Sequence, residues 1–379
     1  MITIILLSRD TSQYLKRALD YYKTAGFKGR IFIADSSSSE ERIQMRMIVK
    51  EFQSDLFFPI IFEYDNATTF TEKVGLVVKQ VCTPYVLLAS MDDFFSVQTL
   101  REGAFFLCDN PDYSFVAGYQ YGYTYVGTDL DWYYTGDSYH PRSIAQENSL
   151  ERIDSYLVNY TSTFHSLFRT AVLDSVLEQS MIYANDFCGK FLENMVTILA
   201  LLSGKGKYLK VPFSWREQRK TSTGAKYHEK WLLDENFEKN ARLMELGIKN
   251  ALEQALQLDS KTADFKSKII IQKFIEYHFN CIFPHQRVTG FSVKRLIKQF
   301  APVCVLVGLK QIKKAFNAIK RSRLSGECFL YEKSSSYYVE FELVNNLIKD
   351  SKIHAYRSGI EDLKMPPKII KGLRSDNGL

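Results

Sequence analysis

The sequence predicts an α/β fold with a mostly parallel central sheet flanked by helices and a mainly helical C-terminal extension. Strand-like and helix-like segments alternate through the first 120 residues, and the alternation resumes near residue 162. Strands that alternate with helices form parallel sheets with right-handed crossovers. Beyond residue 229 the pattern is mostly helical. A chain of 379 residues is long enough for two domains, and we expect a sheet-based domain at residues 1–228 and a helical region at residues 229–379.

Short apolar runs rich in β-forming residues predict the first strands, at residues 2–7, 30–34, 57–64 and 85–89. The segments between them have apolar residues at helical spacing. These helices are expected to begin near residues that commonly cap helices, namely Thr11 or Ser12, Ser38 or Ser39, Thr69, and Ser96.

The second half of the predicted sheet domain is less regular. Residues 121–160 are rich in Tyr, Gly and Asp, and we expect an irregular excursion over the edge of the sheet there. After it the pattern predicts a strand at 163–168, helices at 170–179 and 186–202, and a short strand at 208–211, before Pro212.

The composition is that of an ordinary globular protein, with 46% hydrophobic and 24% charged residues. Six cysteines are scattered without a CxxC pair or a Cys/His cluster, which indicates a reducing compartment. The apolar start lacks a basic region before it, and no apolar run approaches the roughly 20 residues of a membrane span. We therefore expect a cytoplasmic protein.

The charge is unevenly distributed. Residues 261–323 contain 14 Lys/Arg and 2 Asp/Glu, although the whole chain has a net charge of only +6. Basic amphipathic helices are expected within residues 290–323, and such helices can lie on an anionic membrane surface. The alternative is a helix whose apolar stripe packs on the rest of the protein. Nucleic-acid binding is not expected, because the rest of the chain is acidic and no motif for it is present.

Two adjacent carboxylates, Asp92 and Asp93, follow the apolar run at residues 85–89. The carboxyl ends of strands in open α/β sheets are where ligands bind. Two carboxylates at such a place suit a hard divalent cation that phosphate oxygens also hold. The alternative is a turn in which an aspartate caps the next helix.

The order of these motifs resembles a GT-A-fold glycosyltransferase of the inverting family-2 type, a Rossmann-like fold, over roughly residues 1–225. Asp35-Ser-Ser-Ser-Ser-Glu40 resembles the nucleotide-contacting acidic turn of that family, and Ser90-Met-Asp-Asp-Phe94 resembles its DxD-like metal motif. Glu193-Asn194 occupies the place of the "ED" pair that carries the catalytic base. Met91 and Asn194 stand where the family commonly has acids.

The resemblance implies a role for each of these positions. Glu193, or alternatively Asp186, would be the catalytic base, and Asp92 and Asp93 would hold Mg²⁺ or Mn²⁺. His165 and Trp215 would contact the acceptor, with a hydrogen-bonded core histidine and a surface loop as the alternatives. The nucleotide sugar would be bound by Ser8, Arg9, Asp35, Lys73, Asp92, Arg216 and Arg219.

The function implied is transfer of a sugar from a nucleotide-diphosphate sugar to a hydroxyl of a glycan or lipid-linked acceptor. The resemblance also implies that the anomeric configuration inverts and that a divalent metal assists the transfer. It further implies a place in bacterial surface polysaccharide or glycoconjugate synthesis. The C-terminal region would serve the acceptor, the inner face of the cytoplasmic membrane, or oligomerisation. One rival is a nucleotidyltransferase, but the glycine-rich loop expected after its first strand is missing. The other rival is a catalytically degenerate GT-A-fold module that binds glycans or a membrane surface.

Overall fold

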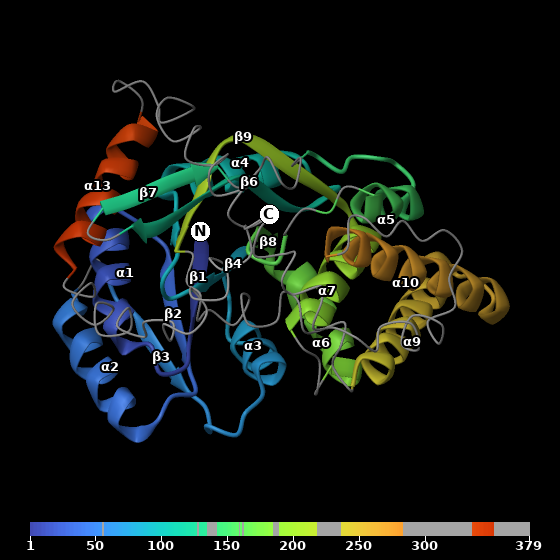
Figure 1. Ribbon diagram of the computed structural model, residues 1–379, viewed down its shortest axis with the longest axis horizontal. Coiled ribbons are helices and arrows are strands. Elements are labelled where there is room, and N and C mark those ends of the chain that lie inside the picture. The colour runs from blue at the N-terminus through green and yellow to red at the C-terminus, as the bar shows by residue number, and fades with distance from the viewer. Residues whose placement is uncertain are drawn as a thin grey trace, which may run out of the picture.

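The computed structural model describes residues 1–54, 57–126, 129–134, 142–158, 160, 163–184, 189–217, 236–282 and 336–351. Within these residues a nine-stranded sheet runs through the molecule, with helices on both of its faces (Figure 1). The predicted mixed α/β architecture with a mostly parallel central sheet and C-terminal helices is confirmed.

The first half of the sheet is parallel, as expected. Its strands are β1 (Ile2–Ser8), β2 (Arg30–Asp35), β3 (Ile60–Glu63) and β4 (Tyr85–Ser90), in the order β3-β2-β1-β4. The register aligns Ser8 of β1 with Asp35 of β2, Asp35 with Glu63 of β3, and Leu7 of β1 with Ser90 of β4. All four strands therefore end close together, and the loops that follow them gather at one edge of the sheet.

The second half continues the sheet with strands of both directions. The strands are β5 (Phe94–Phe95), β6 (Tyr113–Val126), β7 (Asp129–Tyr134), β8 (Leu167–Arg169) and β9 (Lys205–Glu217). β8 is antiparallel to β4 and β6, β6 runs parallel to β9, and β5 and β7 pair antiparallel with β9 and β6.

In this half one prediction was wrong, and a predicted strand was confirmed but is longer than expected. Part of the excursion expected at 121–160 belongs to β6 and β7, and the short strand expected at 208–211 is the middle of a 13-residue strand. β6 carries bulky Tyr residues, and two of them, Tyr121 and Tyr123, are buried. Gly118 allows its close approach to β9, since a Cβ there would lie 2.8 Å from the Val211 carbonyl oxygen. The glycine and tyrosine residues of this segment therefore belong to a packed strand and not to a loop.

Alternate side chains of β1 face opposite hydrophobic clusters, as expected for a sheet covered on both faces. Ile5 faces the cluster beneath α3 (Phe70–Val78), α6 (Thr170–Ala184) and α7 (Gly189–Ser203). Ile4 and Leu6 face the cluster that covers the other side. That side is covered by α1 (Ser12–Thr24), α2 (Ser39–Phe52) and α4 (Val97–Asp109).

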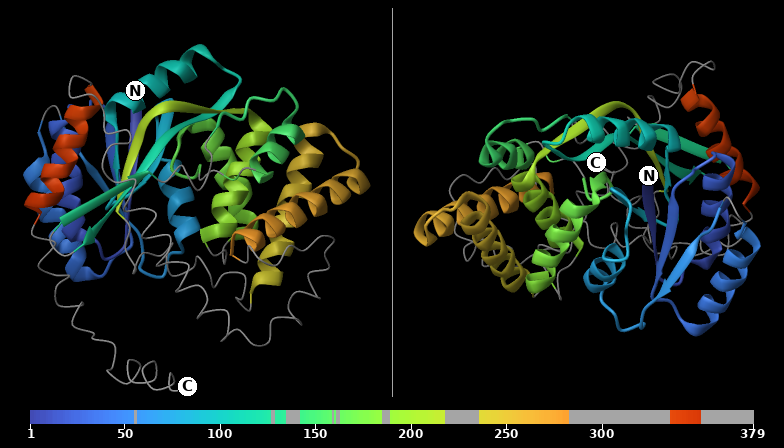
Figure 2. Two further views of the ribbon diagram at one scale, coloured as in Figure 1. Left: turned by 45° about the horizontal axis from the view of Figure 1, so that its top comes forward. Right: turned by 180° about the vertical axis from the view of Figure 1, so that it is seen from behind.

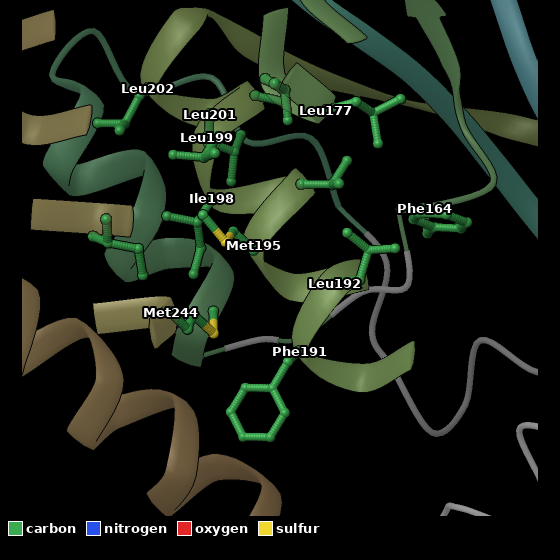
Figure 3. Packing of buried hydrophobic residues seen from close by; sticks show 14 of the residues in the cluster. Phe164, Leu177, Phe191, Leu192, Met195, Ile198, Leu199, Leu201, Leu202 and Met244 are labelled. Atoms are coloured by element: carbon green, nitrogen blue, oxygen red, sulfur yellow. The ribbon is translucent and has the colours of Figure 1, made fainter. Parts of the chain in front are cut away.

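The α9 (Phe237–Leu256) and α10 (Ser260–Ile282) helices pack beside α5 (Ser149–Val158), α6 and α7. Figure 3 shows the buried side chains between them, where Phe191, Met195 and Met244 meet. The last described helix, α13 (Ser336–Asp350), returns to the opposite face beside α1. The two further views of Figure 2 show the same separation, with the red helix beside the blue ones and the yellow and orange pair on the other side.

Polar contacts tie α13 to α4. The Glu340 carboxylate accepts a hydrogen bond from the Gln98 backbone nitrogen at 2.9 Å, and the Tyr337 hydroxyl donates to Glu102 at 2.7 Å.

No helix among the described residues is long and apolar enough to cross a membrane. The basic segment at 290–323 lies outside the described residues.

We expect α13 to contribute to the stability of the fold. Ile348 is fully buried, so Ile348→Ala should lower the free energy of unfolding by about 2–5 kcal/mol. Val339 lies on the same helix at 65% exposure, and Val339→Ala should change it by no more than about 0.5 kcal/mol. Denaturant unfolding of both variants tests this, and equal effects would contradict the docking of α13.

Candidate active site

The carboxyl ends of β1, β2 and β4 lie side by side, and their loops bring together the polar residues expected from the sequence. Ser8 and Asp35 end β1 and β2, and Asp92 and Asp93 follow β4. All four residues are buried. Buried polar groups are costly unless they are paired, so their partners define what this edge of the sheet can do.

One side of the site is built around the Lys73 ammonium, from α3. It donates hydrogen bonds to the Ser8 carbonyl oxygen at 2.6 Å and to the Ser36 hydroxyl at 2.8 Å. Burial lowers the pKa of Lys73 to about 8, although the Asp35 and Asp10 charges oppose this shift. A positive charge on Lys73 therefore sits between the ends of β1 and β2.

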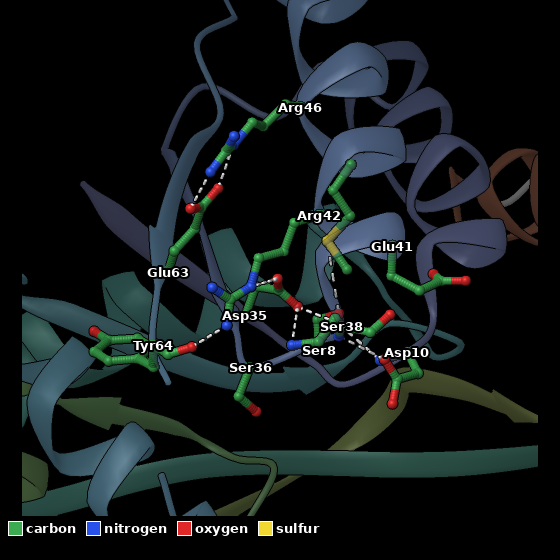
Figure 4. Close-up of polar contacts among 12 residues, drawn as sticks. Ser8, Asp10, Asp35, Ser36, Ser38, Glu41, Arg42, Arg46, Glu63 and Tyr64 are labelled. Atoms are coloured by element: carbon green, nitrogen blue, oxygen red, sulfur yellow. Dashed lines mark hydrogen bonds and ion pairs between the residues drawn. The ribbon is translucent and has the colours of Figure 1, made fainter. Parts of the chain in front are cut away.

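Asp35 is held in the turn that follows β2 (Figure 4). Its Oδ1 accepts hydrogen bonds from the Ser37 backbone nitrogen and hydroxyl, and its Oδ2 lies 3.7 Å from the Arg42 Nε. Asp10, with a positive φ of 52°, accepts from the Ser38 backbone nitrogen at 2.9 Å. The serine run thus supplies the donors that fix two loops against each other.

The other side of the site is the Asp92–Asp93 turn. The Arg216 Nε, on β9, donates to Asp93 Oδ2 at 2.9 Å. The Asp93 side chain is 4% exposed and that of Arg216 is 24% exposed. Burial alone would lower the pKa of Arg216, but the carboxylates of Asp93, Glu193 and Asp92 outweigh it and raise that pKa.

A buried network that the sequence did not point to holds this turn from behind. The Arg17 Nη2 donates to the Asp92 carbonyl oxygen and to Glu217 Oε2, each at 3.3 Å. The Tyr123 hydroxyl lies 3.5 and 3.3 Å from the same two oxygens and shares its one proton between them. Arg17, Tyr123 and Glu217 are all buried, and breaking a buried ion pair costs about 3–5 kcal/mol. The main chain of Asp92 is therefore firmly placed.

One signal for this network was present in the sequence. Arg17 lies three residues after Tyr14 and four before Tyr21, on the face of α1 that is buried. A charged residue within an apolar helical stripe indicates a buried partner. Its partners at Asp92 and Glu217 are 75 and 200 residues away, so the stripe alone identifies neither.

Glu193 faces the same site from α7 and is half-buried. Its charge acts on both Arg216 and His165, which places it on the site's side of the helix. The neighbouring Asn194 is fully buried, and its Oδ1 accepts from the Tyr156 hydroxyl at 2.7 Å. The pair at 193–194 thus has one residue toward the site and one in the core.

His165 is held as a neutral imidazole with a defined tautomer. Its Nδ1 lies 2.8 Å from the Leu88 carbonyl oxygen, which only accepts, so Nδ1 carries the proton. Burial, and then the Arg216 charge, lower the pKa of His165 to about 4, against weaker opposing effects of Leu88, Glu193 and Asp92. At neutral pH the Nε2 is therefore a hydrogen-bond acceptor.

The other predicted residues differ in their placement. Arg9 is exposed at the rim beside Ser8. Trp215 is fully buried and aligned with Phe94 of β5, so a sugar cannot stack on it in this structure, and the acceptor-contacting role expected for it does not fit. Asp186 and Arg219 lie outside the described residues.

The donor set at the turn fits a divalent cation only in part. Carboxylate oxygens are the ligands that Mg²⁺ and Mn²⁺ prefer, and Mg²⁺ commonly takes one or two carboxylates together with substrate phosphates. Among the described residues, no group of three or more His, Cys, Asp or Glu side chains could hold a metal. Asp92 and Asp93 therefore suit a cation that phosphate oxygens and water also hold.

We expect the burial of neutral His165 to make stability depend on pH. Its pKa is lowered in the folded state from an ordinary value of 6.5 to about 4, so the unfolded chain binds more protons between these values. Stability is then full above pH 6.5 and falls as the pH drops toward 4. His165→Asn can keep a donor for Leu88 but cannot titrate. Between pH 7 and 5 the wild type should lose about 1–2 kcal/mol more than this variant in denaturant unfolding. Equal losses would show that His165 is not held neutral.

Comparison with known proteins identifies the fold. No family model matches the sequence, and no curated protein matches it. Solved structures do match. Residues 1–349 of TarS from S. aureus, in complex with UDP-GlcNAc, give a TM-score of 0.52 at 16% identity over 75% of this chain and 74% of that chain. The UDP complex gives 0.50 at 13% identity over 94% and 91%.

A mannosyltransferase from Pyrobaculum calidifontis, PcManGT, in complex with GDP-Man and Mn²⁺, gives a TM-score of 0.43 at 11% identity over 92% of this chain and 85% of that chain. This likeness is too weak to support an argument about the present site. The TarS matches extend over most of the chain, and identities this low bear on the fold alone. The protein has a GT-A-like glycosyltransferase fold.

Proposed function

We propose that the protein transfers a sugar from a nucleotide-diphosphate sugar to a hydroxyl of a glycan or lipid-linked acceptor, with inversion and with help from a divalent metal. The observation that carries this proposal is the meeting of Asp92, Asp93, Arg216 and Glu193 where parallel strands end. The likeness of the fold to TarS, which binds UDP-GlcNAc, supports it. A role in bacterial surface polysaccharide or glycoconjugate synthesis is part of the proposal.

The nucleotide is proposed to bind at the ends of β1 and β2. Lys73 brings a positive charge there, and Asp35 brings a buried carboxylate that its turn holds in place. Ser8 and Arg9 lie beside them at the end of β1. A carboxylate and an ammonium offer an acceptor and donors to the polar groups of a base or ribose.

The diphosphate is proposed to bind at the Asp92–Asp93 turn. Asp92 and Asp93 would hold Mg²⁺ or Mn²⁺, which stabilises negative charge on a diphosphate leaving group. Arg216 contributes a permanent positive charge whose planar guanidinium suits phosphate oxygens. Arg219 is proposed as a further phosphate ligand.

The transfer itself needs one base on the acceptor side. Glu193 is proposed to take the proton of the acceptor hydroxyl as its oxygen attacks the anomeric carbon from the face opposite the diphosphate. The bond to the diphosphate breaks, the nucleoside diphosphate leaves with that electron pair, and the anomeric configuration inverts. His165 is proposed to accept a hydrogen bond from the acceptor through Nε2. Asp186 remains the alternative base.

Residues 1–228 are proposed as the catalytic domain, and residues 229–379 as a region for the acceptor, a membrane surface or oligomerisation. The excess of basic residues in 290–323 supports contact with the inner face of the cytoplasmic membrane. The partners in this proposal are the donor and the acceptor, without nucleic acid. A cytoplasmic location goes with it.

A degenerate module that binds glycans or a membrane surface is the second candidate. Two positions favour it. Met91 and Asn194 have no carboxylate where the resembling family commonly has acids. Met91 is buried next to the Asp92–Asp93 turn, and the Asn194 side chain accepts a hydrogen bond from Tyr156 in the core. Release or transfer of sugar from a nucleotide donor would exclude this candidate.

We expect Glu193→Gln to separate chemistry from binding. Removing a general base should slow transfer by about 100-fold or more, while donor affinity stays within about twofold. Steady-state transfer assays and calorimetric titration of the donor measure the two effects. Glu178→Gln is the matched control, because Glu178 lies on α6 with a side chain 68% exposed. Full transfer by Glu193→Gln would remove this role.

We expect Arg216→Gln to weaken donor binding at saturating Mn²⁺. A hydrogen bond to a charged group contributes about 1.5–3 kcal/mol, so the dissociation constant should rise by about 10- to 100-fold. Arg46→Gln is the control, because Arg46 forms an exposed ion pair with Glu63 at the β3 edge. Unchanged affinity in Arg216→Gln would place the diphosphate away from β9.

A further inference from the structure

The contact between Arg216 and Asp93 puts a positive charge on one of the two carboxylates proposed to hold a metal. The guanidinium Nε lies 2.9 Å from Asp93 Oδ2, within hydrogen-bond distance. A guanidinium keeps its charge at any pH that a folded protein tolerates. Asp93 therefore has a counter-ion in the protein itself, before any ligand is present.

The exposure of the two side chains makes this pair open to exchange. The Asp93 side chain is 4% exposed, whereas the Arg216 side chain is 24% exposed and so lies nearer the solvent. A second charged pair nearby, Arg17 and Glu217, is only 3% and 0% exposed and has no such access. Of these two pairs on the turn, the one at Asp93 is placed to exchange partners without unpacking the core.

The surrounding charge favours a cation strongly. The carboxylates of Asp92 and Glu193 also lie close enough to act on the Arg216 guanidinium. Among the described residues, the carboxylates of Asp93, Glu193 and Asp92 all act on this one guanidinium, which opposes their attraction for a further cation. Removing the guanidinium would take away one positive charge and the hydrogen bond that Asp93 Oδ2 accepts from it.

We propose that Arg216 is the built-in counter-ion of Asp93 and competes with a divalent cation for that carboxylate. The competition makes metal binding weak while Arg216 is on Asp93. The inference rests on the proposed function in one respect: the diphosphate of the donor would bind Arg216 in place of Asp93. Arg216 then has two opposite effects. It weakens the binding of the metal alone and strengthens the binding of the nucleotide diphosphate.

The test measures Mn²⁺ binding to the whole 379-residue chain without any nucleotide. The electron paramagnetic resonance signal of free Mn²⁺ gives the dissociation constant for the wild type and for Arg216→Gln. We expect Arg216→Gln to bind Mn²⁺ at least about tenfold more tightly. The substitution removes a positive charge close to the cation, and the repulsion between them is only partly screened by solvent. Equal or weaker binding by Arg216→Gln would overturn the proposal.

Further variants keep this result specific. Arg216→Met, which is similar in length and uncharged, should show the same gain and serves if Arg216→Gln does not fold. Arg216→Lys keeps the charge and should stay within about threefold of the wild type. In the Asp93→Asn background, Arg216→Gln should give no gain, and a gain there would place the competition at another group. Arg46→Gln should leave Mn²⁺ binding unchanged.

Because no nucleotide is present, this outcome is independent of the proposed function. A gain in Mn²⁺ affinity with no response to any nucleotide sugar would support the competition and reject the transferase. Nucleotide binding by the wild type with no gain in Arg216→Gln would reject the competition and leave the transferase in place.

Discussion

The end of β9 holds the Asp92–Asp93 turn from two sides, and the candidate site depends on this arrangement. Successive side chains of a strand point to opposite faces, so Arg216 and Glu217 reach different parts of the turn. Arg216 pairs with the Asp93 side chain, while Glu217 pairs with Arg17, which holds the Asp92 carbonyl oxygen. The short pairing of β5 with β9 fixes the same turn in register, with Phe94 opposite Trp215.

The charges around this turn fall into two layers with different consequences. The inner layer, Arg17 with Glu217, is sealed in the core and positions the main chain. The outer layer, Arg216 with Asp93, is partly exposed and faces Glu193 and the neutral His165. A fixed inner layer permits an outer layer that can exchange partners, because the turn keeps its place when the outer pair changes.

The sequence predicted the parallel half of the sheet because its strands are continuous apolar runs between capped helices. It also predicted that Asp92, Asp93, Arg216 and Glu193 serve one site, and the structure brings these residues together at the edge of the sheet. Their chemical roles stay predictions. β6 was missed, and β9 was predicted only at 208–211, because the Tyr, Gly and Pro residues of these strands are typical of loops. In β9, Pro212 is accommodated next to shifts in the register with β6.

The buried network behind the turn was not predicted, because its partners lie far apart along the chain. Arg17 contacts residues 75 and 200 positions away, and no local pattern encodes such a distance. Trp215 was expected at the site because aromatic residues stack on sugars, but alternation along β9 turns it into the core. Burial of a side chain depends on the tertiary packing of its strand, and one residue of shift exchanges the two faces.

A crystal structure of the protein with a nucleoside diphosphate and Mn²⁺ would show where each part of the donor binds. We expect the base or ribose to lie beside Asp35 and Lys73, the diphosphate to contact Arg216, and the cation to lie on Asp92 or Asp93. A nucleotide bound elsewhere, or a cation held away from both aspartates, would contradict this expectation.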